Sequence, residues 1–253
     1  MTIASEDLEG KLGVTFSEMF RRFWNAHVPE KTPCFGVATS KLSQARYAVV
    51  RLHPEHGWLI EVRDDLVDNA ELEVSLAHEL FHLILYKEGY PAVCRSQEEL
   101  PNEWNPDEWD EAMGLVHSIL SHPVIRQRMR HEGFPIDEHL PKEIRETLEV
   151  LETYCVPDPD DFVYWRLWVL TYVLNRCDGV DQVCSYIAGR AAPVAEQGEE
   201  YSRWLDLAGY SEPGSVTVPK MIEIGRRFLE LLEMDAFCLL CVMGNGALMK
   251  VPG

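Results

Sequence analysis

The segment from Asn69 to Glu88 constrains the fold of this chain more than any other. Asp68 with Glu71 three residues later is a capping-box-like start, and Gly89 followed by Pro91 is a stop. These signals predict one helix over residues 69–88. Its leucines recur at helical spacing and predict a stripe buried in the core: Leu72, Leu76, Leu80 and Leu83.

The same helix carries the sequence His78-Glu79-Leu80-Phe81-His82. Residues four apart project from the same helical face, so His78 and His82 can present two imidazoles to one metal ion. Glu79 projects at an adjacent angle, where its carboxylate can reach a water that zinc activates. The spacing therefore predicts a zinc site with Glu79 as the general base. The structural alternative is two histidines that share a helical face without binding a metal.

A catalytic zinc site needs a third protein ligand and one position left open. The first candidate is Glu111, 29 positions after His82 in a second capped helix, and the alternative is His117, which lies in an apolar stripe. Six residues separate these two side chains, so they point about 120° apart and cannot both bind one ion. Asp110 and His122 are further candidates.

Two tyrosines near the end of the motif helix, Tyr86 and Tyr90, carry phenols that can donate to a developing oxyanion. Packing in the core with a satisfied hydroxyl is the favoured interpretation of both. A separate Cys238-x-x-Cys241 pair has no second pair of cysteines and no preceding thioredoxin-like strand. We interpret it as a structural helix face rather than a redox or metal site.

Around these motifs the pattern predicts an α+β fold. A helix over 16–27 is followed by short strands over 45–52 and 58–63, joined by a hairpin connection at residues 53–57. The second capped helix begins at Asn105-Pro106 and breaks or kinks at His122-Pro123. Beyond Pro135 the expected helices are 142–154, 162–177, 181–189, 196–208 and 219–241.

The composition excludes several classes of protein. A net charge of −19 over 253 residues argues against nonspecific nucleic-acid binding, which requires clustered Lys and Arg. No segment is long and apolar enough for a membrane span, and the N-terminus lacks the features of a signal peptide. Seven cysteines without a regular framework favour reduced thiols. We therefore expect a cytoplasmic protein.

The segment from about Ala45 to Met129 resembles the ImmA/IrrE-type metallopeptidases, which are compact relatives of the gluzincins. The shared pattern is a β-hairpin, a helix with His-Glu-x-x-His, and a following helix that bears an acid. The resemblance implies Zn²⁺ held by His78 and His82, Glu79 as general base, and Glu111 as the glutamate ligand. It also implies that an edge strand aligns an extended peptide, and Trp58–Arg63 is the strand expected to do so.

These observations lead to one functional hypothesis with two alternatives. The chain is expected to be an intracellular zinc metallopeptidase that acts on a peptide or protein substrate, with a zincin-like domain over residues 1–134 and a helical region over 135–253. The alternatives are a non-catalytic binding protein on the same scaffold and a zinc hydrolase of a small amide. An open groove would suit the peptide, and a closed cavity would suit the small amide. The sequence indicates neither the oligomeric state nor the role of residues 135–253.

Overall fold

The computed structural model describes residues 5–31, 35–41, 48–53, 57–64, 69–102, 104–210, 216–244 and 247–251. The chain forms two compact units, and each is made of two stretches of sequence. Unit 1 comprises residues 1–89 and 125–141, and unit 2 comprises residues 90–124 and 142–253. Both contain helices and a small sheet, so the fold is α+β as expected. The boundary predicted near residue 134, beyond which the sequence pattern is helical, stays a prediction.

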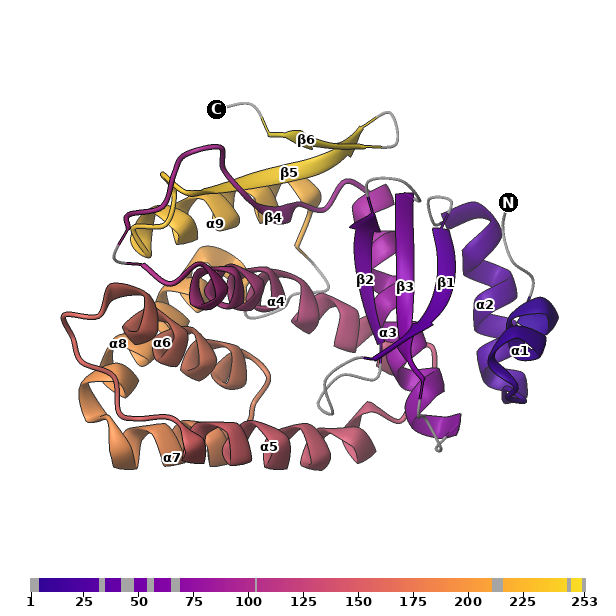
Figure 1. Cartoon of the computed structure of the whole chain (residues 1–253), viewed down its shortest axis with the longest axis horizontal. Coiled ribbons are helices and arrows are strands. Elements are labelled where there is room, and N and C mark those ends of the chain that lie inside the picture. The colour runs from indigo at the N-terminus through magenta and orange to yellow at the C-terminus, as the bar shows by residue number, and fades with distance from the viewer. Residues whose placement is uncertain are drawn as a thin grey trace. The chain divides into compact units, whose positions relative to one another are not determined.

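Unit 1 is built on a three-stranded sheet and the motif helix (Figure 1). Its elements are α1 (Ser5–Leu12), α2 (Glu18–Lys31), β1 (Phe35–Ser40), β2 (Ala48–His53), β3 (Gly57–Arg63) and α3 (Asn69–Lys87). The strand order is β1-β3-β2, with β1 parallel and β2 antiparallel to β3. Helix α3 packs against β2 and α2. The helix expected at 69–88 is confirmed, whereas the capping residue Asp68 lies outside the described residues.

The central position of β3 corrects one prediction. Trp58–Arg63 was expected to be an edge strand that receives a peptide, but β1 and β2 pair with it on both sides. The strand β1, which was not expected from the sequence, supplies the additional partner. Trp58, Ile60 and Val62 do share one buried face, as their alternation predicted. Beside α3 it is β2 that forms an edge of this sheet.

Helices α4 and α5 each contribute to both units. Helix α4 (Pro106–His131) continues through Pro123, and its last turns, from Ile125, belong to unit 1. The sequence predicted a break or kink at His122-Pro123, and the helix is not interrupted there. Helix α5 covers Ile136–Thr153, and its residues from Lys142 onward belong to unit 2. The cap expected at the start of α4 is present, because the Asp107 N–H donates to Asn105 Oδ1 at 3.0 Å.

Unit 2 combines a helical bundle with a second three-stranded sheet (Figure 1). Its other elements are β4 (Ala92–Arg95), α6 (Phe162–Cys177), α7 (Asp181–Arg190), α8 (Ala192–Leu205), η1 (Asp206–Tyr210), α9 (Val218–Leu231), β5 (Cys238–Gly244) and β6 (Ala247–Lys250). Helix α8 packs on α6 and α7, and the antiparallel strands lie in the order β4-β5-β6. None of the helices in the described part of the chain combines the length and the apolar composition that crossing a bilayer requires.

The second sheet corrects the prediction of a helix over 219–241, while the region from residue 135 onward is largely helical, as predicted. Helix α9 ends at Leu231, and Glu233 adopts a left-handed backbone conformation with φ 58°. The Met234 N–H then donates to the Leu229 carbonyl at 2.9 Å, which closes the helix end. A glutamate in this position gives no glycine signal in the sequence, so the stop was missed. Cys238 and Cys241 accordingly lie on a strand and not on a helix face.

A close approach between α6 and α8 yields a stability prediction. A Cβ atom at Gly198 would lie 2.5 Å from Cδ1 and 3.0 Å from Cβ of Tyr172. The backbone of α6 fixes the position of the Tyr172 Cβ atom, so this atom cannot move aside. Gly198→Ala is therefore expected to lower the free energy of unfolding by about 1–3 kcal/mol through overpacking. Gly114→Ala in α4 is the matched control, since a Cβ atom added there would meet nothing within 4 Å and alanine favours a helix. Denaturant unfolding of both variants tests this, and equal stabilities would contradict the tight α6–α8 contact.

Candidate metal centre

The motif histidines lie on one face of α3, near its middle. The Nε2 atoms of His78 and His82 are 3.2 Å apart. Two nitrogens at about 2.05 Å from one tetrahedral zinc ion would be roughly 3.3 Å apart. His82 is buried, at 6% exposure, while His78 is half-buried. The pair therefore already has the separation that a shared metal ion requires, although one neutral ring can also donate to the other at this distance.

A third imidazole completes a group that can bind a metal ion. His78, His82 and His122 each offer one nitrogen, and these atoms lie within 4.8 Å of one another. His122 is on α4, one turn before the part of that helix that belongs to unit 1. Three imidazoles are a donor set that suits zinc and neighbouring divalent transition metals. The described residues thus hold three imidazoles that are close enough together to bind a metal ion.

The two third-ligand candidates from the sequence lie elsewhere on α4. Glu111 is exposed and precedes His122 by eleven residues, about 16 Å along the helix axis. Burial raises the pKa of Tyr154, and the charge of Glu111 raises it further, so Glu111 lies near Tyr154. His117 precedes His122 by five residues, which turns it roughly 140° around the axis. Burial lowers the pKa of His117 to about 4, so the ring is neutral near pH 7.

Glu79 is fixed by the neighbouring sheet. Its Oε2 atom accepts a hydrogen bond of 2.8 Å from the backbone N–H of Val50 on β2. This bond orients the carboxylate and joins the motif helix to an edge strand within unit 1. No sequence pattern indicates this bond, because the donor is a main-chain group that any residue except proline would supply. Glu79 is thus beside the first histidine and is hydrogen-bonded to the edge strand β2.

A buried carboxylate on the same helix fixes α3 to α2. Glu73 is only 7% exposed, and it accepts hydrogen bonds from the backbone N–H and the hydroxyl of Ser17, at 2.5 and 2.6 Å. Ser17 also caps α2, because its Oγ accepts from the Phe20 N–H at 3.2 Å. Burying Glu73 is tolerable because both donors satisfy it. These two hydrogen bonds from Ser17 restrain α3 about one turn before the histidines.

The tyrosines of the motif region have structural contacts. The ring of Tyr86 stacks on Trp58 at 5.1 Å between centroids and lies 6.2 Å from the ring of His82. The hydroxyl of Tyr90 donates to the carbonyl of Val216 at 3.0 Å. Core packing, the favoured interpretation of both residues, agrees with these contacts. Tyr86 supports the buried side of His82.

A tyrosine hydroxyl restores the hydrogen bonding of α4 beside His122. Pro123 has no N–H, so it cannot make the helical bond to the Ile119 carbonyl. Tyr210 donates to this carbonyl at 2.8 Å and lies 2.9 Å from the Leu120 carbonyl oxygen. Burial raises the pKa of Tyr210 far above its usual value, so the phenol keeps its proton. Helix α4 therefore continues through its proline with a side-chain donor in place of the missing N–H.

Tyr210→Phe tests this contact. The variant is expected to lose about 1–3 kcal/mol of unfolding free energy, because a buried carbonyl then has neither the helical N–H nor the hydroxyl. Tyr164→Phe is the matched control, since the Tyr164 hydroxyl donates to the Cys155 carbonyl at an exposed site. Thermal or denaturant unfolding compares the two. A loss at Tyr210 no larger than that at Tyr164 would show that the hydroxyl does not support α4.

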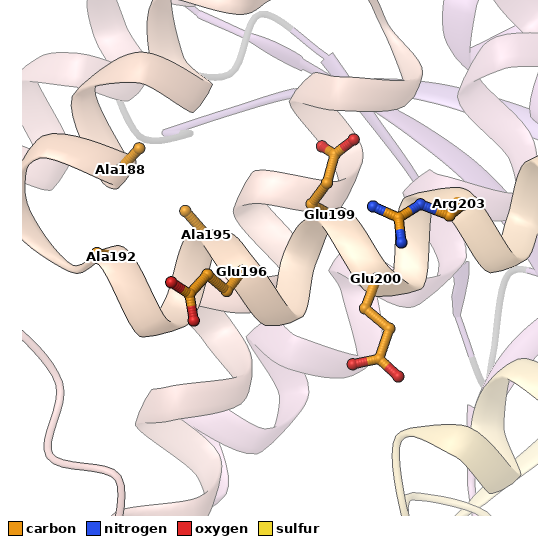
Figure 2. A pocket seen from close by; sticks show the side chains of 7 residues that line it. All are labelled: Ala188, Ala192, Ala195, Glu196, Glu199, Glu200 and Arg203. Atoms are coloured by element: carbon orange, nitrogen blue, oxygen red, sulfur yellow. The ribbon is translucent and has the colours of Figure 1, made fainter.

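A separate hollow of about 600 Å³ lies along α7 and α8 (Figure 2). It is lined by Ala188, Ala192, Ala195, Glu196, Glu199, Glu200 and Arg203. Glu199 is engaged by the Tyr172 hydroxyl at 3.2 Å and by Arg176 at 3.3 Å. Among the described residues, the wall of this hollow includes neither a histidine nor a cysteine. It therefore lacks the nitrogen and sulfur donors of a transition-metal site.

Comparisons of the chain with protein-family models, with curated proteins and with solved structures gave no match.

Proposed function

We propose that this chain is a zinc-dependent hydrolase of peptide bonds, with His78, His82 and His122 as metal ligands and Glu79 as general base. The observation that carries the proposal is the 3.2 Å separation of the His78 and His82 nitrogens, with a third imidazole nitrogen within 4.8 Å. Three imidazoles leave one position of a tetrahedral ion open, as a catalytic site requires. The zincin-like character of unit 1 is part of the same proposal.

The chemistry divides between the ion and the protein. Zinc, when bound, supplies the positive charge that acidifies a water molecule and polarises a substrate carbonyl. Glu79 contributes the base: its carboxylate accepts the proton of the attacking water and then delivers it to the leaving amine. The hydrogen bond from Val50 restricts the rotation of this carboxylate, so little ordering remains to be done during the reaction. Buried His82 limits solvent at one side of the group.

The edge strand β2 favours an extended peptide as substrate. Its backbone lies against α3 and contacts Glu79 through Val50. A peptide that added to this edge by main-chain hydrogen bonds would pass beside the general base. Such a peptide would pair with β2 beside the Val50–Glu79 bond and leave the carboxylate oriented.

The Val50 contact also favours one alternative, a non-catalytic binding protein in which Glu79 has a structural role. The carboxylate would then serve to hold β2 on α3, and the histidine group would bind a structural metal. The two functions differ in whether a bound metal supports hydrolysis. Both functions can be tested on one preparation of the protein.

The test is cleavage of a defined peptide mixture by the zinc-loaded full chain, followed by mass spectrometry. We expect cleavage at internal peptide bonds that stops with a chelator and returns when zinc is added back. Retained zinc with an intact peptide mixture would favour the binding protein. Cleavage that is insensitive to the chelator would contradict the assignment of zinc as the cofactor.

A further inference from the structure

The turn of α4 that carries His122 also contains a proline. Any other residue at position 123 would donate its N–H to the carbonyl of Ile119, and Pro123 has no such donor. The proline ring also crowds the carbonyl four residues earlier, which is again that of Ile119. Ile119 is fully buried, so bulk water does not reach this carbonyl. The turn therefore has a backbone acceptor that only a group from outside the helical ladder can satisfy.

Two buried hydroxyls supply donors to this turn. Tyr210 donates to the Ile119 carbonyl at 2.8 Å and lies 2.9 Å from the Leu120 carbonyl oxygen. Ser121 donates to the His117 carbonyl at 2.8 Å. Tyr210 is 4% exposed and Ser121 is 6% exposed, so solvent does not compete for these bonds. Ser121 belongs to α4 itself, whereas Tyr210 anchors the turn to another element.

The backbone of η1 holds Tyr210 in place. Gly209 has φ 90° and interrupts η1 immediately before Tyr210, in a conformation that glycine adopts without strain. The π-helical segment η1 packs against α8. The residues of η1 and those of α4 up to Val124 all belong to unit 2. The hydroxyl thus reaches α4 from a fixed neighbour within the same unit.

The placement of His122 follows from this contact. His122 lies between the two carbonyls beside the Tyr210 hydroxyl and the proline that lacks the N–H. Without the hydroxyl, the buried Ile119 carbonyl loses its donor, and the backbone torsions of this turn are free to readjust. Such a readjustment moves the His122 imidazole, whose nitrogen now lies within 4.8 Å of those of His78 and His82. Metal–ligand distances tolerate displacements of only about 0.2 Å.

We propose that Tyr210 is a positioning residue for the metal centre. Its hydroxyl takes the place of the N–H that Pro123 lacks, and it thereby fixes the turn that presents His122. Tyr210 acts through the backbone of α4 and is not itself a ligand. The inference rests on the proposed function, because that function makes His122 a metal ligand.

The first test is the metal binding of Tyr210→Phe in the full chain. Competition with a chromophoric chelator is expected to show zinc affinity weakened by about tenfold, as for other groups that orient a ligand. The visible absorption of the cobalt-loaded variant is expected to differ from that of the wild type, because this spectrum reports the ligand geometry. Unchanged zinc affinity together with an unchanged cobalt spectrum would overturn the proposal.

Tyr201→Phe is the matched control. Tyr201 is likewise buried, and its hydroxyl lies 3.4 Å from a backbone carbonyl, that of Leu231 at the end of α9. Its loss therefore removes a buried tyrosine hydroxyl without touching α4. The control is expected to keep the zinc affinity and the cobalt spectrum of the wild type. An equal loss of affinity in both variants would show a general effect of stability and would contradict a role of Tyr210 in placing His122.

Pro123→Ala supplies the rescue, because alanine restores the helical N–H that donates to the Ile119 carbonyl. In the Pro123→Ala background, Tyr210→Phe is expected to weaken zinc binding by less than about threefold, which is the coupling of a double-mutant cycle. A tenfold loss in both backgrounds would show that the hydroxyl does not replace the N–H. If Tyr210→Phe alone did not fold, the double variant would decide: wild-type zinc affinity would support the proposal, and loss of zinc would overturn it.

The failure of this inference and the failure of the proposed function give different results. If His122→Ala lost the metal while Tyr210→Phe kept the wild-type affinity and spectrum, only the role of Tyr210 would be wrong. If the wild-type chain bound neither zinc nor cobalt, or if His122→Ala kept the wild-type affinity, the assignment of the metal centre would be overturned as well.

Discussion

Replacing His122 with alanine is expected to weaken zinc binding by at least about 100-fold, because one of three protein ligands is lost. The expectation follows from the nitrogens of His78, His82 and His122, which lie within 4.8 Å of one another. A competition titration against a chromophoric zinc chelator measures the effect. His78→Ala and His82→Ala are expected to show losses of the same order.

His117→Ala and Glu111→Ala are the matched controls on the same helix. His117→Ala is expected to keep the zinc affinity within about threefold and to lower the thermal midpoint, because it leaves a cavity in a packed region. Glu111→Ala is expected to change neither quantity much, since Glu111 is exposed and lies about 16 Å from His122 along α4. Zinc lost from Glu111→Ala and retained by His122→Ala would instead favour the glutamate ligand implied by the resemblance.

Glu79→Gln is expected to lower the rate of peptide hydrolysis by about 10²–10⁴-fold while the zinc content stays at the wild-type level. The amide cannot take the proton of the attacking water. Its oxygen can still accept the hydrogen bond from the Val50 N–H, so the link between α3 and β2 is preserved. The rate is measured on a peptide that the wild-type chain cleaves, with the metal content determined in parallel.

Glu79→Ala separates the two roles of this carboxylate. It removes both the base and the acceptor for Val50, so it is expected to lose activity and also about 1–3 kcal/mol of stability. If Glu79→Gln hydrolysed peptides at the wild-type rate, Glu79 would have only the structural role. If it lost zinc together with activity, Glu79 would belong to the metal ligands.

The parts of the fold that the sequence predicted correctly have strong local signals. Helix α3 has a stop signal and a leucine stripe, and α6 agrees with its expected range of 162–177 because Asp161 caps its first turn. The His78 and His82 geometry follows from helical spacing alone. These features depend on residues close together in the sequence.

The parts that were missed depend on contacts between distant residues. Strand β1 is defined by its pairing with β3. Strand β5 is defined by its pairing with β4, from which it is separated by about 145 residues of chain. The place of His122 depends on α4 continuing through Pro123, and the Tyr210 hydroxyl that supports this helix is 87 residues away in the sequence. The local pattern predicted a break or kink there, since a proline normally ends or bends a helix. Tertiary hydrogen bonding overrode that tendency.

X-ray absorption spectroscopy of the zinc-loaded full chain tests the central claim most directly. The histidine group predicts about one zinc per chain, with nitrogen or oxygen neighbours at about 2.0–2.1 Å and the scattering pattern of imidazole rings. The His78→Ala variant is expected to lose this signal. Sulfur neighbours at about 2.3 Å would place the metal on the cysteines of the second sheet, and a chain that holds no zinc after loading would remove the metal centre altogether.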